Sequence, residues 1–201
     1  EITYGDWSSD VCSSDLAMKG LDAIKHFWNI ACNVESKPFN MLEIGPGYGG
    51  ICEYVKMLHG TNYYAIDVNP LFKCDTLYEC DGRNIPSQIP CNLDLVYSIN
   101  VFQHLSDNQR TSYYKQIFEV LRPGGGFVFS MFALTPNNFD KPYWHMSDTK
   151  GKFLCAFFNQ FTTVVDVFDL KKELESIGFE FHLLYELENS CSFLAVKPNN
   201  L

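Results

Sequence analysis

The sequence predicts an α/β fold in which a mostly parallel sheet is covered by helices on both faces and ends in an antiparallel hairpin. Segments with strand character alternate with segments of helical periodicity, which is typical of parallel sheets. A glycine-rich turn follows the first predicted strand, where the absence of side chains lets the backbone approach a ligand. The last two predicted strands are joined only by residues 188–190, and such a short connection requires an antiparallel pair.

Length and composition predict one globular domain. The chain has 201 residues, of which 46% are hydrophobic and 19% charged, and no linker or internal repeat divides it. Because no apolar run approaches the roughly 18 residues of a membrane span, we expect no membrane partner and a cytoplasmic protein. The net charge of -9 disfavours a nucleic-acid partner, since that backbone is itself anionic. The sequence does not indicate an oligomeric state.

The eight cysteines predict neither disulfides nor a metal site. None of them forms a C-x-x-C pair, and a chain of this length does not need covalent staples. We therefore expect reduced thiols, with those in apolar runs behaving as small buried hydrophobic side chains.

The first residues are expected to be foreign to the domain. Residues 6–16 (DWSSDVCSSDL) resemble the translation of a common sequencing adapter. This predicts an artefactual lead over residues 1–16 and a single domain over residues 17–201. The alternative is a flexible lead rich in serine and aspartate.

The remaining elements follow in chain order. Apolar residues at helical spacing predict a first helix near 20–33, ended by Pro38, and Ser106 and Asp166 are expected helix caps. Strands are expected at 41–44, 63–66, 77–80, 93–99, 127–132, 179–187 and 191–196, and further helices at 51–58, 107–121 and 167–177. Only residues 69–75 connect the second and third predicted strands, which is short for a parallel crossover. Either the helix there is reduced to about one turn, or the third strand is misplaced.

The first chemical motif is the segment 43–50, EIGPGYGG, at the end of the first predicted strand. The helix that follows would direct its N-terminal N–H groups at a ligand, and Asp67 at the end of the second strand could accept both hydroxyls of a ribose. Gly45, Gly47 and Gly50 also satisfy the G-x-G-x-x-G pattern of NAD-binding domains. However, Glu43 suits a cationic ligand better than a pyrophosphate, and the chain is short for a separate substrate domain.

With these motifs, the sequence resembles the class I S-adenosylmethionine-dependent methyltransferases from about Met41 to Pro198. Residues 92–98 are similar to the family's fourth-strand motif, and residues 120–125 to its approach to the fifth strand. The resemblance implies a three-layer Rossmann-like fold with a seven-stranded, mostly parallel sheet and an antiparallel C-terminal hairpin. It also implies S-adenosyl-L-methionine as the cofactor and methyl transfer (EC 2.1.1) as the activity.

The resemblance assigns a role to residues at three strand ends. Glu43 would orient the cofactor's ammonium group, Asp67 would hold the ribose, and Ser98 would offer its backbone carbonyl. The expected cofactor-binding residues are Glu43, Gly45, Pro46, Gly47, Tyr48, Gly49, Asp67, Val68, Asp81, Gly82 and Ser98. Of these, Asp81 and Gly82 depend on the placement of the third strand.

The residues that bind the methyl acceptor are expected after the fourth strand and in residues 133–165, a segment that contains seven aromatic side chains. A loop of this length is usually functional, and we expect it to cover the acceptor. The alternative is a second small core. The expected catalytic residues are His104 and His145, and the expected substrate contacts are Asn100, Gln103, Tyr143 and Trp144. An imidazole can take the acceptor's proton near neutral pH, although His104 could instead be a helix-start histidine bonded to the backbone.

The expected function is methylation of a small-molecule acceptor, with oxygen as the methylated atom, by in-line displacement. Two alternatives remain open on the sequence alone. One is an NAD(P)-binding oxidoreductase, and the other is a non-catalytic methyltransferase-like protein that binds the cofactor.

Overall fold

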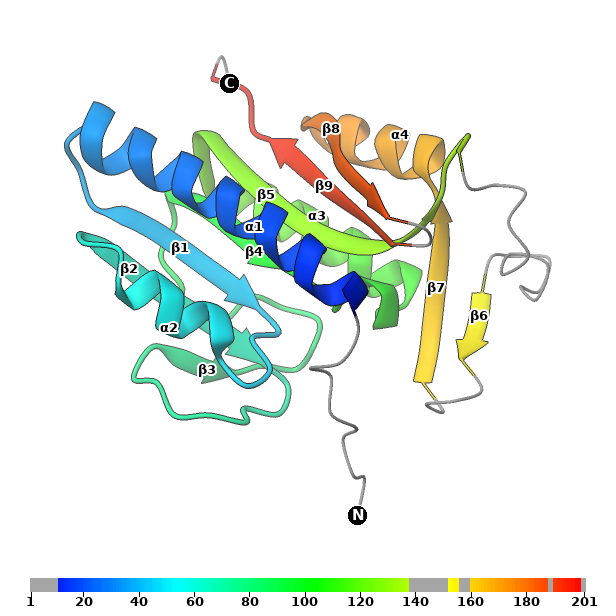
Figure 1. The fold of residues 1–201 in the computed structure, drawn as a ribbon, viewed down its shortest axis with the longest axis horizontal. Helices are drawn as coiled ribbons and strands as arrows, with labels where there is room; N and C mark the ends of the chain where they lie inside the picture. Colours follow the sequence, from blue (N-terminus) through cyan, green and yellow to red (C-terminus); the bar gives the residue numbers. More distant parts are fainter. Residues whose placement is uncertain (1–10, 138–151, 156–159, 188–189, 200–201) are drawn as a thin grey trace.

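The computed structural model describes residues 11–137, 152–155, 160–187 and 190–199. Figure 1 shows a central sheet between two layers of helices, with α1 and α2 on one face and α3 and α4 on the other. The helices are α1 (Val11–Asn29), α2 (Gly50–Lys56), α3 (Asp107–Val120) and α4 (Val167–Ile177), with a π-helical turn η2 (Ile30–Val34) and a 3-10 turn η3 (Phe102–His104). The strands are β1 (Phe39–Ile44), β2 (Thr61–Asp67), β3 (Leu77–Glu79), β4 (Leu93–Ser98), β5 (Leu121–Leu134), β6 (Lys152–Cys155), β7 (Gln160–Asp166), β8 (Glu180–Leu187) and β9 (Ser190–Val196).

The topology confirms the predicted fold class. The strands β3, β2, β1, β4 and β5 are neighbours in that order and run parallel. The strand β9 then pairs antiparallel with β5, and β8 pairs antiparallel with β9. All seven strands expected from the sequence are present. The resulting three layers are those that the resemblance implies.

Two strands were not predicted: β6 lies in the segment 133–165, and β7 begins in it and ends at Asp166. The strand β7 pairs in parallel with the end of β5, through Phe132 to Leu134, and β6 pairs antiparallel with β7. This is possible because β5 spans 14 residues and its last two residues extend beyond the part that pairs with β9. The same strand also begins earlier than expected, at Leu121, so α3 ends at Val120 rather than at the following proline and glycine.

The first helix also differs from the prediction. It begins at Val11, inside the segment expected to be a foreign lead, and ends as the π-helical turn after Asn29. Its sequence contains no proline from residue 11 to residue 29, so nothing in the backbone chemistry interrupts the helix there. The clear apolar periodicity that predicted a helix begins only at Leu21.

The link between β2 and β3 contains no helix. The strand β3 is nevertheless parallel to β2, with Ala65 opposite Leu77, so the third predicted strand is confirmed. Residues 68–76 form turns and bends, and Phe72 and Cys74 from this loop pack against the core between the sheet and α1 and α2. These two side chains cover the part of the sheet that a crossover helix would otherwise cover.

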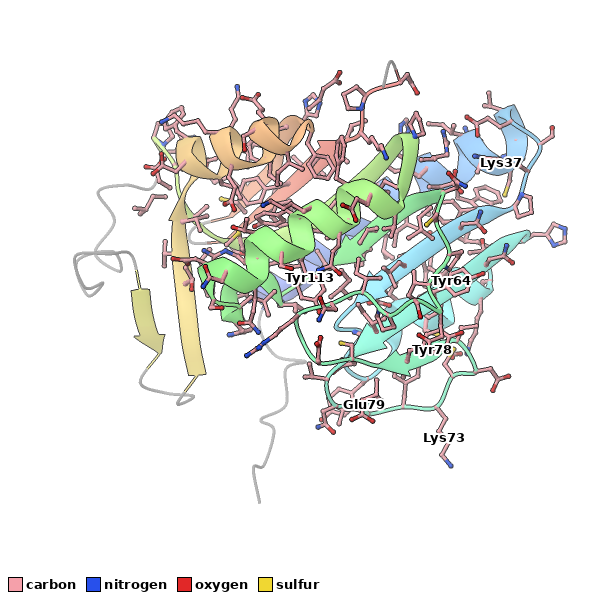
Figure 2. The ribbon with its side chains drawn as sticks, turned by 180° about the vertical axis from the view of Figure 1, so that it is seen from behind. Lys37, Tyr64, Lys73, Tyr78, Glu79 and Tyr113 are labelled. Carbon is pink, nitrogen blue, oxygen red and sulfur yellow. The ribbon has the colours of Figure 1, made fainter. Side chains whose placement is uncertain are left out.

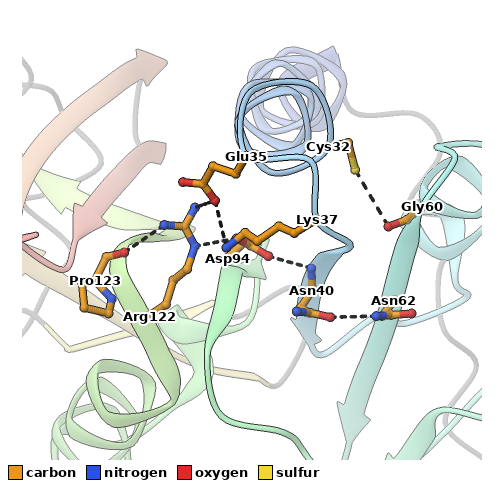
Figure 3. A network of polar contacts seen from close by, with 9 residues as sticks. All are labelled: Cys32, Glu35, Lys37, Asn40, Gly60, Asn62, Asp94, Arg122 and Pro123. Atoms are coloured by element: carbon orange, nitrogen blue, oxygen red, sulfur yellow. Dashed lines mark hydrogen bonds and ion pairs between the residues drawn. The ribbon is translucent and has the colours of Figure 1, made fainter.

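A buried charge network joins the amino-terminal ends of the central strands (Figure 3). The Asp94 side chain is fully buried. It is 2.6 Å from Arg122 Nε and 3.0 Å from Lys37 Nζ, and it accepts a hydrogen bond of 2.8 Å from the backbone N–H of Asn40. Glu35 pairs with both cations. The carboxylate is therefore neutralised and fully hydrogen-bonded, as a buried charge requires.

The opposite, carboxyl-terminal edge of the sheet is built differently. In Figure 2, Lys37 marks the amino-terminal edge and Glu79, at the end of β3, marks the carboxyl-terminal edge. The glycine-rich turn and the η3 turn follow the carboxyl ends of β1 and β4, and Asp67 is the last residue of β2. Ligands of open parallel sheets bind at this edge. Within the described residues, no helix combines the length and the apolar character needed to cross a bilayer.

Candidate active site

The turn after β1 presents bare backbone to open space. Gly45, Gly47 and Gly49 have φ angles of 72°, 55° and 81°, a region that side chains with a Cβ rarely adopt. A Cβ added to Gly45 would lie 2.4 Å from Val101 Cγ2, whereas one added to Gly47 would meet no heavy atom within 4 Å. The turn is thus closely packed at Gly45 and open at Gly47, where a ligand could contact the backbone.

Glu43 lies beneath this turn, two residues before Gly45. Its side chain is only 5% exposed, and its Oε2 accepts a hydrogen bond of 2.5 Å from the hydroxyl of Tyr63 on β2. Burial raises the pKa of Glu43 to about 7; the Tyr63 hydrogen bond opposes this rise, and the negative charge of Asp67 adds to it. A cationic ligand nearby would favour the ionised carboxylate.

Asp67 ends β2, and its position is fixed by its own loop. Its Oδ1 accepts a hydrogen bond of 2.9 Å from the backbone N–H of Asn69, and the side chain remains half-buried. Val68, the next residue, is 59% exposed. A Cβ added to Gly82 would lie 3.0 Å from Val68 Cγ1, so the two residues expected to flank an adenine ring are neighbours.

The Asp81 carboxylate is used within its own loop. It accepts hydrogen bonds from the backbone N–H groups of Arg83 and Asn84, both at 2.8 Å, and from the Asn84 side chain at 2.7 Å. These bonds lower the pKa of Asp81. The side chain therefore holds the turn that presents Gly82, and a contact between Asp81 and the adenine ring remains a prediction.

The end of β4 is tied to the glycine turn. The buried Ser98 hydroxyl donates a hydrogen bond of 2.9 Å to the carbonyl of Ile44, the residue before Gly45. Asn100 adopts a left-handed conformation with a φ of 60°, and its backbone N–H donates to Ser130 Oγ at 2.8 Å. The loop that leaves β4 is therefore held against both β1 and β5.

The η3 turn carries the residues expected to face the acceptor. Phe102 anchors it, because its ring contacts Tyr114 and two phenylalanines of β5 in the core. Gln103 is 4% exposed, and its Oε1 has no hydrogen-bond partner in the described part of the chain. A buried, unpaired amide oxygen is unfavourable. His104 lies next to it and is half-buried.

The strand β7 lies beside this turn. The buried Thr163 hydroxyl of β7 donates a hydrogen bond of 3.5 Å to the carbonyl of Leu105, immediately after η3. The end of the segment expected to cover the acceptor therefore lies next to the residues expected to bind it. Tyr143, Trp144 and His145 lie outside the described residues.

Three side chains that contribute to this edge were not identified from the sequence. Tyr63 holds Glu43, Phe72 packs against Gly49, and Gln109 donates a hydrogen bond of 3.1 Å to the carbonyl of Gly82 while its Oε1 accepts from the Ser106 N–H. Only the strand register could have revealed Tyr63, which shares a face of β2 with Ala65, the residue opposite Glu43. Among the described residues, no three His, Cys, Asp or Glu side chains converge on a point that could hold a metal ion.

Comparison with known proteins agrees with this geometry. Residues 21–184 match the family model described as a methyltransferase domain. The norajmaline N-methyltransferase of Rauvolfia serpentina is 28% identical over 135 residues, which cover 60% of this chain and 45% of that protein. The phosphoethanolamine N-methyltransferase of Plasmodium falciparum is 27% identical over 127 residues, which cover 58% of this chain and 47% of that protein. The chain thus spans about half the length of these curated relatives.

Solved structures share the fold at low sequence identity. An S-adenosylmethionine-dependent methyltransferase from Methanosarcina mazei has a TM-score of 0.61 at 18% identity, covering 81% of this chain and 93% of that one. The 1,6-didemethyltoxoflavin-N1-methyltransferase of Burkholderia thailandensis has a TM-score of 0.58 at 16% identity, covering 94% and 88%. The family model matches well over half of the residues. The chain therefore belongs to the class I S-adenosylmethionine-dependent methyltransferases, and its cofactor is S-adenosylmethionine.

Proposed function

We propose that the protein transfers a methyl group from S-adenosylmethionine to a small-molecule acceptor. The observation that carries the proposal is the turn at Gly45–Gly49, which is open at Gly47 and flanked by two carboxylates, Glu43 and Asp67. Bare backbone suits the close approach of a ligand. The two acids suit a ligand that is cationic at one end and carries ribose hydroxyls at the other.

Each cofactor-binding role falls to a residue whose position is fixed by the fold. When bound, S-adenosylmethionine supplies an electrophilic methyl group on a positively charged sulfur. Glu43, held by Tyr63, favours the cationic amino-acid end, and the Ser98 backbone offers a carbonyl beside it. Asp67 accepts hydrogen bonds from the ribose hydroxyls. Val68 and Gly82 form an apolar surface against which the adenine ring packs.

The acceptor side is assigned to the η3 turn and the segment above it. The buried Gln103 amide oxygen, which receives no hydrogen bond from the described residues, would accept a hydrogen bond from the acceptor, and Asn100 would add a second polar contact. His104 would remove the proton of an acceptor hydroxyl as a general base. The protein's main contribution is alignment, because in-line displacement requires nucleophile, methyl carbon and sulfur to lie on one axis. Residues 133–165 would cover this assembly.

Oxygen is the acceptor atom that we propose first, and nitrogen is the second candidate. One observation favours nitrogen, because the curated relatives described above are named as N-methyltransferases. The Gln103 amide oxygen could accept a hydrogen bond from an amine N–H or from a hydroxyl, so it does not distinguish the two acceptor atoms. Nitrogen acceptors that are neutral at the working pH need less help from a base, so the role of His104 differs between the two cases.

A binding and turnover experiment tests the proposal. Thermal-shift titrations should show stabilisation by S-adenosylmethionine and none by NAD, which separates methyltransferase from oxidoreductase. Incubation with labelled S-adenosylmethionine and parallel sets of phenols, carboxylic acids and amines should then transfer label to one set. Stabilisation by NAD alone would refute the proposal. Cofactor binding without transfer to any set would favour the non-catalytic alternative.

A further inference from the structure

Two glutamines on one face of α3 hold the loop that presents Gly82. Gln109 and Gln116 are separated by two helical turns, so their side chains project from the same side of the helix. The Gln116 amide donates a hydrogen bond of 2.9 Å to the carbonyl of Arg83 and accepts one of 2.7 Å from the backbone N–H of Ile85. The Gln109 amide donates one of 3.1 Å to the carbonyl of Gly82. Both side chains therefore attach the loop after β3 to α3.

The other end of the Gln109 amide holds the exit of the η3 turn. Its Oε1 accepts hydrogen bonds from the backbone N–H of Ser106 at 3.0 Å and from the Ser106 hydroxyl at 2.7 Å. Ser106 is the N-cap of α3 and follows Leu105, the residue directly after η3. A backbone N–H can only donate and a carbonyl can only accept, so these partners determine which end of the amide carries the oxygen. One side chain thus joins the loop expected to contact adenine to the turn expected to face the acceptor.

The choice of glutamine at position 109 indicates a role in addition to capping the helix. A glutamate at the third position of a helix can accept the same bond from the N-cap, and its charge is favoured near a helix N-terminus. Only the amide also provides a donor for the Gly82 carbonyl. Gly82 is buried and has a φ of 69°. The group that distinguishes glutamine from glutamate is therefore the one that contacts the cofactor edge.

We propose that Gln109 is a positioning residue that holds Gly82 in place for the adenine ring of the cofactor and fixes this loop relative to η3. The attachment itself depends only on the hydrogen bonds of Gln109. Its effect on binding rests on the proposed placement of the adenine ring against Val68 and Gly82. Without the donor, the Gly82 carbonyl loses its partner on α3, the loop moves, and the surface that contacts the ring is lost.

The substitution Gln109→Glu removes the donor and keeps the cap. Glutamate still accepts the Ser106 N–H bond, so α3 and the fold should be retained, as urea unfolding will show. The matched control is Asn108→Asp, because this exposed neighbour undergoes the same change from amide to carboxylate in the same helical turn.

The first measurement is hydrogen exchange of the cofactor-free protein, followed by mass spectrometry. In Gln109→Glu, residues 82–85 should exchange about ten-fold faster than in the wild type, because one hydrogen bond no longer opposes local opening. Residues 110–117 of α3 should be unchanged, and Asn108→Asp should match the wild type throughout. Equal exchange of residues 82–85 in Gln109→Glu and wild type would overturn the proposal. No cofactor is present, so an error in the proposed function would leave this result unchanged.

The second measurement is calorimetry with S-adenosylmethionine. Gln109→Glu should bind it about ten-fold more weakly than the wild type, whereas Asn108→Asp should bind it equally well. The same affinity in Gln109→Glu and wild type would refute the effect on binding.

A double-mutant cycle shows whether Gln109 acts through Gly82. Gly82→Ala strains the backbone at this φ and places a Cβ 3.0 Å from Val68 Cγ1, so it disturbs the loop by itself. In that background, Gln109→Glu should cause little further loss of affinity for S-adenosylmethionine. A structural role elsewhere in the protein would give additive losses instead, and additive losses would overturn the proposal.

Discussion

Replacing Glu43 by glutamine should stabilise the cofactor-free protein at alkaline pH. The folded pKa of this acid is raised from 4.5 to about 7, which makes ionised Glu43 about 3 kcal/mol less favourable in the folded chain than in the unfolded one. Between these two pH values the folded chain retains a proton that the unfolded chain has lost. The wild-type protein therefore loses about 3 kcal/mol of stability from this group as pH rises from about 4.5 to above 7.

Glutamine resembles the protonated acid and can still accept the Tyr63 hydrogen bond. The Glu43→Gln protein should consequently escape this loss. Urea unfolding at pH 5, 6, 7 and 8 without cofactor measures this loss. The stability difference between variant and wild type should grow by about 2.5 kcal/mol from pH 5 to pH 8. The other groups near this carboxylate, Tyr63, Asp67 and Tyr97, are common to both proteins, so the difference isolates Glu43. A difference that stays constant with pH would refute the reasoning.

The ionisation of Glu43 should also make cofactor affinity depend on pH. A cation bound near Glu43 favours the carboxylate, so binding below pH 7 must also release the proton. Calorimetry should show the affinity of the wild-type protein for S-adenosylmethionine rising by up to about ten-fold per pH unit below pH 7 and levelling above it. The Glu43→Gln protein should bind more weakly and lose this dependence. Identical pH profiles for the two proteins would show that Glu43 does not face the cofactor.

Three further substitutions separate binding, catalysis and stability. Asp67→Ala should reduce affinity for S-adenosylmethionine by about a hundred-fold in calorimetry, because two hydrogen bonds to a charged group are lost. Asp75→Ala on the same loop is the control, and equal affinities of the two variants would show that Asp67 does not bind the ribose. His104→Ala should leave this affinity unchanged and lower kcat by about a hundred-fold in a product assay, and an unchanged kcat would exclude a general base there. Asp94→Asn should destabilise the protein by about 3 kcal/mol in urea without altering cofactor affinity, and a stability equal to wild type would show that its ion pairs contribute nothing net.

The sequence predicted the features whose chemistry is local. A glycine cluster at a strand end, an acid 22 residues after Gly45 and the cap at Asp166 are each encoded within a few residues. The structure confirms the cap, since Asp166 accepts hydrogen bonds from the backbone N–H groups of Phe168 and Asp169. The antiparallel hairpin was predictable for the same reason, because a short connection leaves no other pairing.

Features that depend on register or on strand length were not predictable. The strand β7 forms because β5 extends beyond the part that pairs with β9, and no local sequence pattern predicts the length of β5. The Tyr63 hydroxyl meets Glu43 only because of how the neighbouring strands β1 and β2 are aligned. Residues 69–75 were expected to be a short link for a parallel crossover, yet Phe72 and Cys74 from this loop cover the sheet without a helix.

Two buried acids in the same sheet differ in whether the chain itself supplies their counter-charge. Asp94, near the amino-terminal end of β4, is paired with two cations and a backbone N–H from the chain itself. Glu43, near the carboxyl-terminal end of β1, receives a neutral hydroxyl from Tyr63, and burial raises its pKa to about 7. The fold thus supplies the counter-charge at one edge of the sheet, whereas the bound cofactor would supply it at the other. Removing the charge should therefore have opposite effects at the two positions. The Asp94 variant loses stability and keeps its cofactor affinity, whereas the Glu43 variant gains stability at pH 8 and loses cofactor affinity.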